Sequence, residues 1–355
     1  MPLNIVRGDI VKMKTDVIVN AANNDLQNGG GVCGAIFKAA GAGDLQRSCD
    51  RIGYCKTGSA VATYGYNLSK YIIHTVGPVW IDGNSGERDT LYACYRNSLT
   101  LAQKCECESI SFPLISSGAN GYPNEKALRV AVKAISAFLL ENDMNVLLVL
   151  LKDTKFSMSG KLHSSIQRFI HENYKDAEYE RISQLEFGAL RETSTSLGKP
   201  LDEQTVYASS STKFDHTDAF SPEALRHIAD SKKESFPQML LRLIDERAER
   251  FPKDSDVYRS ANITKSVFSN IRSKPSYQPT KNTAISLAIA LKLPLDVILD
   301  LLGRAGYTLS PSNTHDLIIR YFINEKEYDI FKINEILEQY GQNLLGAPIK
   351  LNKED

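Results

Sequence analysis

The chain contains 355 residues, with 42 Lys and Arg against 42 Asp and Glu, so its formal net charge is zero. This balance excludes a uniformly basic nucleic-acid binder, and the length predicts two domains that each bury their own core. No apolar run approaches the roughly 18 to 20 residues of a membrane span, so we expect no membrane partner. All six cysteines lie in the first third of the chain without paired CxxC spacing. We expect free thiols, no metal site and a cytoplasmic location.

Short apolar runs alternate with helical patterns through the first 175 residues. Strands are predicted at 3–7, 16–20, 60–64, 71–76, 109–112 and 146–151. Helices are predicted between and after them, at 35–40, 43–52, 90–104, 125–141 and 160–174. Apolar strands that alternate with helices are typical of a sheet covered on both faces, so we predict an α/β fold with three layers. Ligands in such folds bind beyond the carboxyl ends of the strands.

The regular pattern stops near residue 175. Residues 176–235 have the composition of a polar linker, with one short helix predicted at 222–228. Helical periodicity then resumes, with helices predicted at 236–247, 256–261, 264–273, 282–292 and 295–302, and two or three more at 317–346. Because no strand pattern is visible after the linker, we predict a second, all-α domain at 236–350.

Two glycine-rich loops each follow a predicted strand and precede a predicted helix. They read NAANNDLQNGGGVCGAIFKAAG at 20–41 and SSGANGYP at 116–123. Glycine lets a backbone approach a phosphate closely, and the free N–H groups of a helix N-terminus favour anions. Two such loops can bind the two phosphates of a diphosphate. Neither loop has the Lys followed by Ser or Thr of a P-loop, so phosphoryl transfer has no support.

A series of short motifs occurs in a fixed order along this first part of the chain. They are GDI at 8–10, NAAN at 20–23, GGGV at 29–32, CKTG at 55–58, HTVGPVW at 74–80, LYACYRNSL at 91–99 and the SSGANGYP loop. In this order they resemble the macrodomain family, in its MacroD-type branch, over residues 1–175. The resemblance implies an α/β/α sandwich with a mixed central sheet that binds ADP-ribose or a derivative, with no separate cofactor. An ADP-ribosylated protein is a further implied partner.

The resemblance also implies roles for single residues. Asp9 would accept a hydrogen bond from the adenine amino group, and the backbone N–H of Ile10 would meet the ring. Asn23 would point at the hydroxyls of the distal ribose. The remaining implied ligand-binding residues belong to the two glycine loops and are Asn20, Gly30, Gly31, Val32, Cys33, Ser116, Ser117, Gly118, Ala119, Asn120, Gly121 and Tyr122.

One departure from the family pattern concerns catalysis. Hydrolytic members read GGGVDGAIHRAAG where this chain reads GGGVCGAIFKAAG, so Cys33 replaces the Asp proposed to activate water and Phe37 replaces the His. A thiol is a poor general base at pH 7. It acts instead as a nucleophile where a helix N-terminus stabilises the thiolate, or it packs as a small buried residue. Cys33 and Asn23 are the catalytic candidates under the first of these readings.

Two further departures concern the shape of the ligand site. Asn120 stands where the family's phosphate loop usually carries an aromatic residue, and the segment LLKDTKF leaves Leu151 or Phe156 to face the adenine. These changes favour a shifted ligand or a modified ADP-ribose. Binding rests on backbone donors and Asp9, which are present, so we predict binding first. The alternative is an ADP-ribosyl hydrolase or an O-acyl-ADP-ribose deacylase.

The segment 255–281 combines a short helix, a tight connection and a second helix. It resembles the helix-turn-helix of the Xre or lambda-repressor type. The stretch 257–281 contains five basic residues and no acidic one, which suits phosphate contacts. The candidate nucleic-acid contacts are Lys265, Ser266, Ser269, Asn270, Arg272 and Lys274.

The same helical bundle also serves in other proteins as a protein interaction module. Residues 321–341 mix acidic and apolar side chains in a pattern that suits a partner groove or self-association. DNA and a protein therefore both stand as partners of the second domain. Together the two domains suggest a regulator or adaptor that senses an ADP-ribose species in signalling or bacterial defence.

Overall fold

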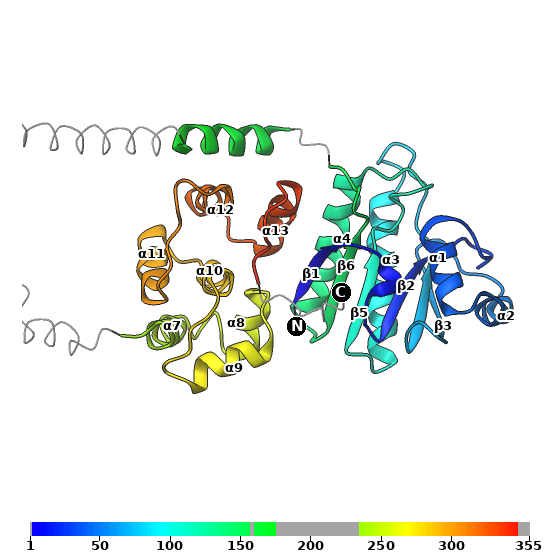
Figure 1. Cartoon of the computed structure of the whole chain (residues 1–355), viewed down its shortest axis with the longest axis horizontal. Helices are drawn as coiled ribbons and strands as arrows, with labels where there is room; N and C mark the ends of the chain where they lie inside the picture. Colours follow the sequence, from blue (N-terminus) through cyan, green and yellow to red (C-terminus); the bar gives the residue numbers. More distant parts are fainter. Residues whose placement is uncertain (1, 157–159, 175–233, 347–355) are drawn as a thin grey trace, which may run out of the picture.

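The computed structural model describes residues 2–156, 160–174 and 234–346, arranged as in Figure 1. We call residues 2–156 the α/β region and residues 234–346 the helical region. The predicted linker lies outside the described residues except for Glu234 and Ser235, and so do its predicted short helix and the last residues of the predicted second domain.

Six strands form one sheet in the α/β region, and each predicted strand boundary lies within one residue of the observed one. They are β1 (Leu3–Arg7), β2 (Val17–Ala21), β3 (Ala60–Tyr64), β4 (Tyr71–Thr75), β5 (Ser109–Pro113) and β6 (Asn145–Leu150). Their order in the sheet is β1-β6-β5-β2-β4-β3. Only β3 runs antiparallel to its neighbour. The predicted mixed sheet is therefore confirmed.

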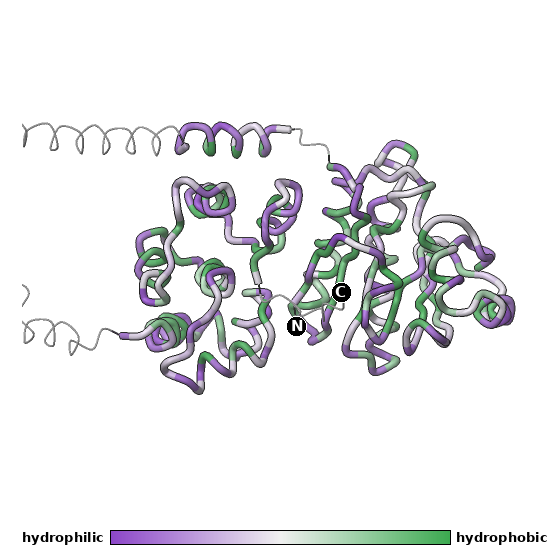
Figure 2. Tube along the Cα trace, viewed as in Figure 1, coloured by the Kyte–Doolittle hydropathy of each residue, from purple (hydrophilic) through white to green (hydrophobic). Residues whose placement is uncertain are grey.

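Helices cover both faces of this sheet. The helices of the region are η1 (Ile10–Lys12), α1 (Gly31–Ala40), α2 (Ala42–Ile52), α3 (Glu87–Lys104) and α4 (Asn124–Leu139). Successive strand residues point to opposite faces: Ile18 packs with Phe37 beneath α1 and α2, whereas Val17 packs with Tyr95 beneath α3 and α4. In Figure 2 much of the trace along the central strands of the sheet is green, the colour of hydrophobic residues. The region is thus the expected three-layer sandwich.

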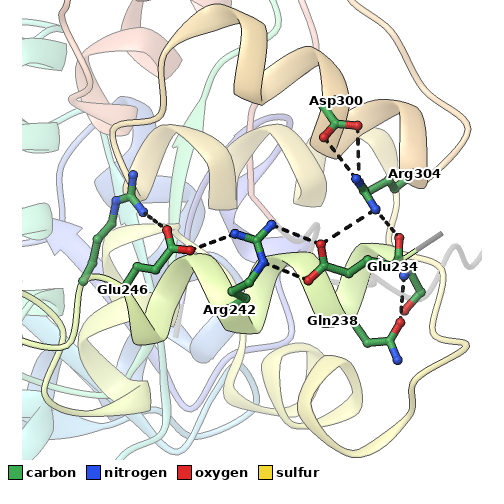
Figure 3. A network of polar contacts seen from close by, with 8 residues as sticks. Glu234, Gln238, Arg242, Glu246, Asp300 and Arg304 are labelled. Carbon is green, nitrogen blue, oxygen red and sulfur yellow. Dashed lines mark hydrogen bonds and ion pairs between the residues drawn. The ribbon is translucent and has the colours of Figure 1, made fainter. Parts of the chain in front are cut away.

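The described part of the helical region contains seven helices and no strand. They are α7 (Phe236–Asp245), α8 (Asp254–Ser260), α9 (Lys265–Ser273), α10 (Lys281–Ala290), α11 (Leu295–Arg304), α12 (Thr314–Asn324) and α13 (Ile330–Gln339). Residues 283–290 of α10 are all buried, so this helix forms the centre of the bundle. Arg242 of α7 and Arg304 of α11 both pair with Glu234, which precedes α7, in a network of ion pairs (Figure 3). Among all the described helices, none has the length and apolarity needed to cross a membrane.

A helix at residues 161–174 follows β6 and packs on the helical region. The ring of His163 stacks on Tyr340 at a centroid distance of 5.7 Å, and the ring of Phe169 meets Tyr321 edge-on at 5.6 Å. This helix was predicted as part of the first domain. In space it packs on the helical region, because its contacts reach Tyr321 of α12 and Tyr340 at the end of α13.

The turn between α8 and α9 binds the edge strand of the sheet. Asn262, at a φ of 53°, accepts a hydrogen bond from the Leu3 N–H at 2.8 Å and donates to the Leu3 carbonyl at 3.0 Å. Its amide also donates to the Leu345 carbonyl at 3.3 Å. An edge strand leaves backbone groups without a strand partner, and Asn262 supplies partners for both groups of Leu3. The predicted helix-turn-helix is therefore attached to the α/β region through its turn.

Candidate functional site

A cavity of about 900 Å³ opens where several strands of the sheet end. Its walls include Ala21 at the end of β2, Val76 after β4, Pro113 at the end of β5, Val149 of β6 and Ile10 of η1. This is the edge at which ligands bind in α/β folds. Both glycine-rich loops contribute to the same cavity.

The first glycine loop places the N-terminus of α1 at the cavity. Gly31 begins the helix at a φ of 59°, a backbone conformation that favours glycine. Gly30 is the N-cap and provides no side-chain hydrogen bond to the helix. The N–H groups of the first turn are therefore not capped by a side chain, and Gly30, Gly31 and Val32 all line the cavity. The helix end thus presents donors suited to an anion.

The second glycine loop forms the facing wall. Ser116 has a φ of 66° and a buried hydroxyl without a hydrogen-bond partner among the described residues. The loop is closed by the Tyr122 N–H, which donates to the Ser116 carbonyl at 3.0 Å, and by the Ser117 hydroxyl, which donates to the Leu114 carbonyl at 2.7 Å. A buried hydroxyl without a partner is costly, so a ligand oxygen at Ser116 would relieve that cost.

The segment after β4 holds this second loop in place. The Asn120 side-chain amide donates a hydrogen bond to the Gly77 carbonyl at 3.1 Å, and the Asn120 backbone carbonyl accepts one from the Trp80 N–H at 2.8 Å. Gly77 has no room for a side chain, because a Cβ there would lie 2.1 Å from the Ser116 hydroxyl. The side-chain amide of Asn120, expected to contact the ligand, thus joins the second glycine loop to the segment after β4.

A buried carboxylate organises the remainder of that segment. Glu87, 3% exposed, accepts hydrogen bonds from the backbone N–H groups of Ile81, Asp82, Gly83 and Ser85. Burial raises the pKa of Glu87, but these hydrogen bonds outweigh it and lower that pKa to about 2. The segment is therefore fixed by a permanent negative charge, and Val79 at its start lines the cavity.

Asp9 marks one end of the cavity. It is exposed and is the N-cap of η1, where one carboxylate oxygen accepts a hydrogen bond from the Val11 N–H at 3.2 Å. Ile10, its neighbour, is buried and also lines the cavity. Of the two residues considered for the adenine face, Leu151 lines the cavity, whereas Phe156 lies beneath the Arg7 guanidinium.

Cys33 lines the cavity and is backed by a buried polar chain. The Asn20 side-chain amide lies 3.6 Å from the Cys33 sulfur and 3.1 Å from Nδ1 of His74. The other ring nitrogen of His74 lies 3.0 Å from the Thr63 hydroxyl. Burial lowers the pKa of His74 to about 4, so the ring is neutral at pH 7. His74 is therefore a buried residue of the core.

Asn23 also lines the cavity, but its side chain holds a turn. Its amide donates to the Gln27 carbonyl at 2.9 Å, and its oxygen accepts from the Gln27 N–H at 2.8 Å. Both groups are therefore used within the loop. A role for Asn23 at the distal ribose requires this turn to open, or uses the second N–H of the amide or a second hydrogen bond accepted by its oxygen.

The structure brings most of the predicted ligand-binding residues to one cavity. Those that line it are Asp9, Ile10, Asn23, Gly30, Gly31, Val32, Cys33, Ser116, Ser117, Gly118, Ala119 and Asn120. Asn20, Gly121 and Tyr122 are not in its lining. Thr57, Gly77 and Thr154 line it and were not predicted. Gly77 was recognisable, because it follows β4, a strand parallel to β2 that ends at the same edge.

The predicted nucleic-acid residues lie together on α9 and its end. Lys265, Ser266, Ser269, Arg272 and Lys274 are exposed, and Asn270 is half-buried. The basic charge around them is partly neutralised by carboxylates from elsewhere in the chain. Arg272 pairs with Asp254, Arg259 with Asp143 and Lys281 with Asp316. Only Lys265 and Lys274, of the five cations in the segment, have no ion pair among the described residues.

The N-terminal region is thus an α/β sandwich with a cavity at the ends of its strands. The first turn of α1 lines this cavity, and no side chain caps its N–H groups. The family model of the Macro domain matches residues 19–131. A Macro domain-containing protein of Methanosarcina mazei is 52% identical over 143 residues, which cover 40% of this chain and 76% of that protein. The chain belongs to the Macro domain family.

Two further proteins show the range of this similarity. An O-acetyl-ADP-ribose deacetylase of Escherichia fergusonii is 47% identical over 142 residues, which cover 39% of this chain and 80% of that protein. A solved structure, the Oceanobacillus iheyensis macrodomain with ADP, is 44% identical and matches 44% of this chain and 83% of that chain, with a TM-score of 0.40.

Proposed function

We propose that the cavity binds ADP-ribose or a derivative of it. The observation that carries the proposal is that one cavity is lined by both glycine loops, by Asp9 and by the polar residues Asn24 and Thr57. In this cavity an adenine would meet Asp9, a diphosphate would lie between the two glycine loops and a ribose would lie near Cys33. Backbone donors and a helix N-terminus suit a diphosphate without a metal ion or a lysine.

Calorimetric titration of the full chain with ADP-ribose tests this proposal. Saturable heat is expected for the wild type. Asp9→Ala should weaken binding about 10-fold or more, because a hydrogen bond to a charged group contributes roughly 1.5 to 3 kcal/mol. Asp25→Ala is a matched control, since Asp25 is an exposed acid outside the cavity lining. No heat from the wild type, or equal losses in both variants, would overturn the proposal.

Hydrolysis is the second candidate function, and the 47% identity to the protein named O-acetyl-ADP-ribose deacetylase favours it. The cavity offers Cys33 where a general base would be needed, so we expect slow turnover by the wild type. Cys33→Asp supplies a carboxylate at that position and should raise turnover about 100-fold. Release of acetate from O-acetyl-ADP-ribose measures it. Turnover that is unchanged by both Asn23→Ala and Gly31→Glu would place any hydrolysis outside this cavity.

For the helical region we propose a regulatory or adaptor role that depends on protein contacts. Its support is that α13, part of the segment predicted to suit a partner groove, packs on α4 of the same chain and so connects the helical region to the α/β region. Such a protein would act in a reducing cytoplasm, in signalling or defence that involves ADP-ribose.

DNA binding is the alternative for the helical region, supported by the exposed side chains of Lys265 and Lys274. We place it second, because three of the five cations in that segment are paired with carboxylates. Electrophoretic mobility shifts of a duplex at rising salt test it. We expect no salt-dependent shift; a shift that is lost in Lys265→Ala combined with Lys274→Ala would favour DNA binding.

A further inference from the structure

Two ion pairs join α13 to the α/β region. The Glu335 carboxylate lies 3.4 Å from Nε of Arg129 on α4, and the Glu338 carboxylate lies 2.8 Å from Nε of Arg7 at the end of β1. Both glutamate side chains are largely buried, with 7% and 10% exposed. They are three residues apart on one helix, and Figure 1 shows α13 beside α4 and β1. The two pairs differ in what lies behind each arginine.

Behind Arg7 is the wall of the cavity. One terminal nitrogen, Nη1, donates to the carbonyls of Lys152 at 3.2 Å and Thr154 at 2.8 Å. The guanidinium also lies over the ring of Phe156, 5.7 Å from its centroid. Arg7 therefore contacts three residues of the segment that follows β6, and it does so while its Nε contacts Glu338.

That segment contains a tight turn, closed by the Thr154 N–H, which donates to the Leu151 carbonyl at 3.0 Å. Leu151 and Thr154 both line the cavity, and they follow Leu150, whose carbonyl accepts a hydrogen bond at 2.8 Å from the N–H of Gly8, the residue before Asp9. Leu151 is 61% exposed, so burial in the core does not fix its position. The guanidinium of Arg7 is planar and presents its donors in a rigid arrangement. Its contacts hold the turn against the end of β1.

The Glu338 carboxylate fixes Arg7 in this orientation. Without Glu338, the Arg7 side chain is free to adopt other rotamers. Holding it against the two carbonyls would then cost conformational entropy. Arg129, by contrast, is 68% exposed and has no contact with the cavity segment within the described structure. Glu335 thus joins the same two regions without reaching the cavity.

We infer that the helical region completes the adenine end of the ligand cavity: Glu338 of α13 orients Arg7, and Arg7 holds the turn that carries Leu151 and Thr154. Arg7 and Glu338 are positioning residues. This inference rests on the proposed binding of ADP-ribose. Since coupling between two equilibria is reciprocal, ligand binding should in turn strengthen the docking of α13.

The test compares Glu338→Gln with Glu335→Gln in the full chain. Both variants remove a carboxylate of α13 from the same interface and keep its volume. Glu338→Gln should weaken ADP-ribose binding in calorimetry by roughly 5- to 20-fold, and Glu335→Gln should leave it within about 2-fold. Thermal unfolding of both variants without ligand measures how much each ion pair contributes to stability, separately from its effect on binding. Equal affinity losses in the two variants, or none in Glu338→Gln, would overturn the inference.

Hydrogen exchange without ligand provides the second measurement. Backbone amides at 151–154 should exchange faster in Glu338→Gln than in the wild type, and should be unchanged in Glu335→Gln. Arg7→Lys keeps a positive charge for Glu338 but not the planar fork, so it should show the same faster exchange. Unchanged exchange in both Glu338→Gln and Arg7→Lys would also overturn the inference. Because this measurement needs no ligand, failure of the wild type to bind ADP-ribose would defeat the proposed function separately.

Discussion

Polar groups serve opposite purposes in the two regions of the molecule. Around the cavity of the α/β region they remain available: the first turn of α1 has no side-chain cap, and the Ser116 hydroxyl has no partner among the described residues. In the helical region charged side chains pair with one another: Arg242 of α7 lies between Glu234 and Glu246, and Arg304 of α11 also pairs with Glu234 (Figure 3). A cluster of charges is therefore not by itself a binding surface. Here the binding surface is made chiefly of backbone groups.

The largest effect should come from breaking the contact between the two regions. Asn262→Ala removes three hydrogen bonds and leaves the N–H and carbonyl of Leu3 without these partners. We expect a loss of about 3 to 5 kcal/mol in the free energy of unfolding, measured by urea denaturation. Asn262→Gly tolerates the positive φ and should lose about 1 kcal/mol less. A loss below about 1 kcal/mol in both variants would show that the edge strand does not depend on this turn.

Within the cavity, the packing of Gly77 against Ser116 can be tested by adding one methyl group. Gly77→Ala places a Cβ 2.1 Å from the Ser116 hydroxyl and 2.7 Å from a methyl group of Ile115. We expect about 2 to 3 kcal/mol of destabilisation in chemical denaturation. Gly118→Ala is the matched control, because a Cβ at Gly118 meets no atom within 4 Å. Equal stabilities of the two variants would mean that the segment after β4 and the second glycine loop move apart at no cost.

His74 should make the α/β region sensitive to mild acid. Burial lowers its folded pKa to about 4 from the ordinary 6.5, so the unfolded chain binds the proton first as the pH falls. Its contribution to stability is complete above pH 6.5 and is lost between 6.5 and 4, by about 2 kcal/mol between pH 7 and 5. Urea denaturation at both pH values measures the loss. His74→Gln should show a smaller loss; an identical pH dependence would contradict the assignment.

The α/β region was largely predictable because each strand is a short apolar run bounded by turn residues. The two glycine loops were correctly placed after strands, and the topology then brings them to one edge. What the pattern left open was the choice between Leu151 and Phe156, because it depends on Arg7, which is distant in sequence. The buried Asn20 was assigned to the ligand from its loop, but its side chain turns toward His74.

The charge of the helical region was harder to predict. The sequence from 257 to 281 carries five cations and no acid, yet the partners of Arg259 and Lys281 lie far away in sequence, at Asp143 and Asp316. Local composition does not reveal such pairs, since they form only when the chain is folded. The docking of α13 on α4 was missed for the same reason: an amphipathic helix specifies an apolar partner but not which one.

The smallest effect is expected where the charges are most numerous. Arg242→Met removes contacts to Glu234 and Glu246, yet half of the Arg242 side chain is exposed, and surface ion pairs contribute little. We expect Tm to shift by less than about 2 °C. Arg304→Met should shift it more, because Arg304 is only 22% exposed and also donates to the Glu234 backbone carbonyl. If Arg242→Met lowered Tm more than Arg304→Met, exposed ion pairs would stabilise this network more than the less exposed contacts of Arg304. Burial would then not explain how much each arginine contributes.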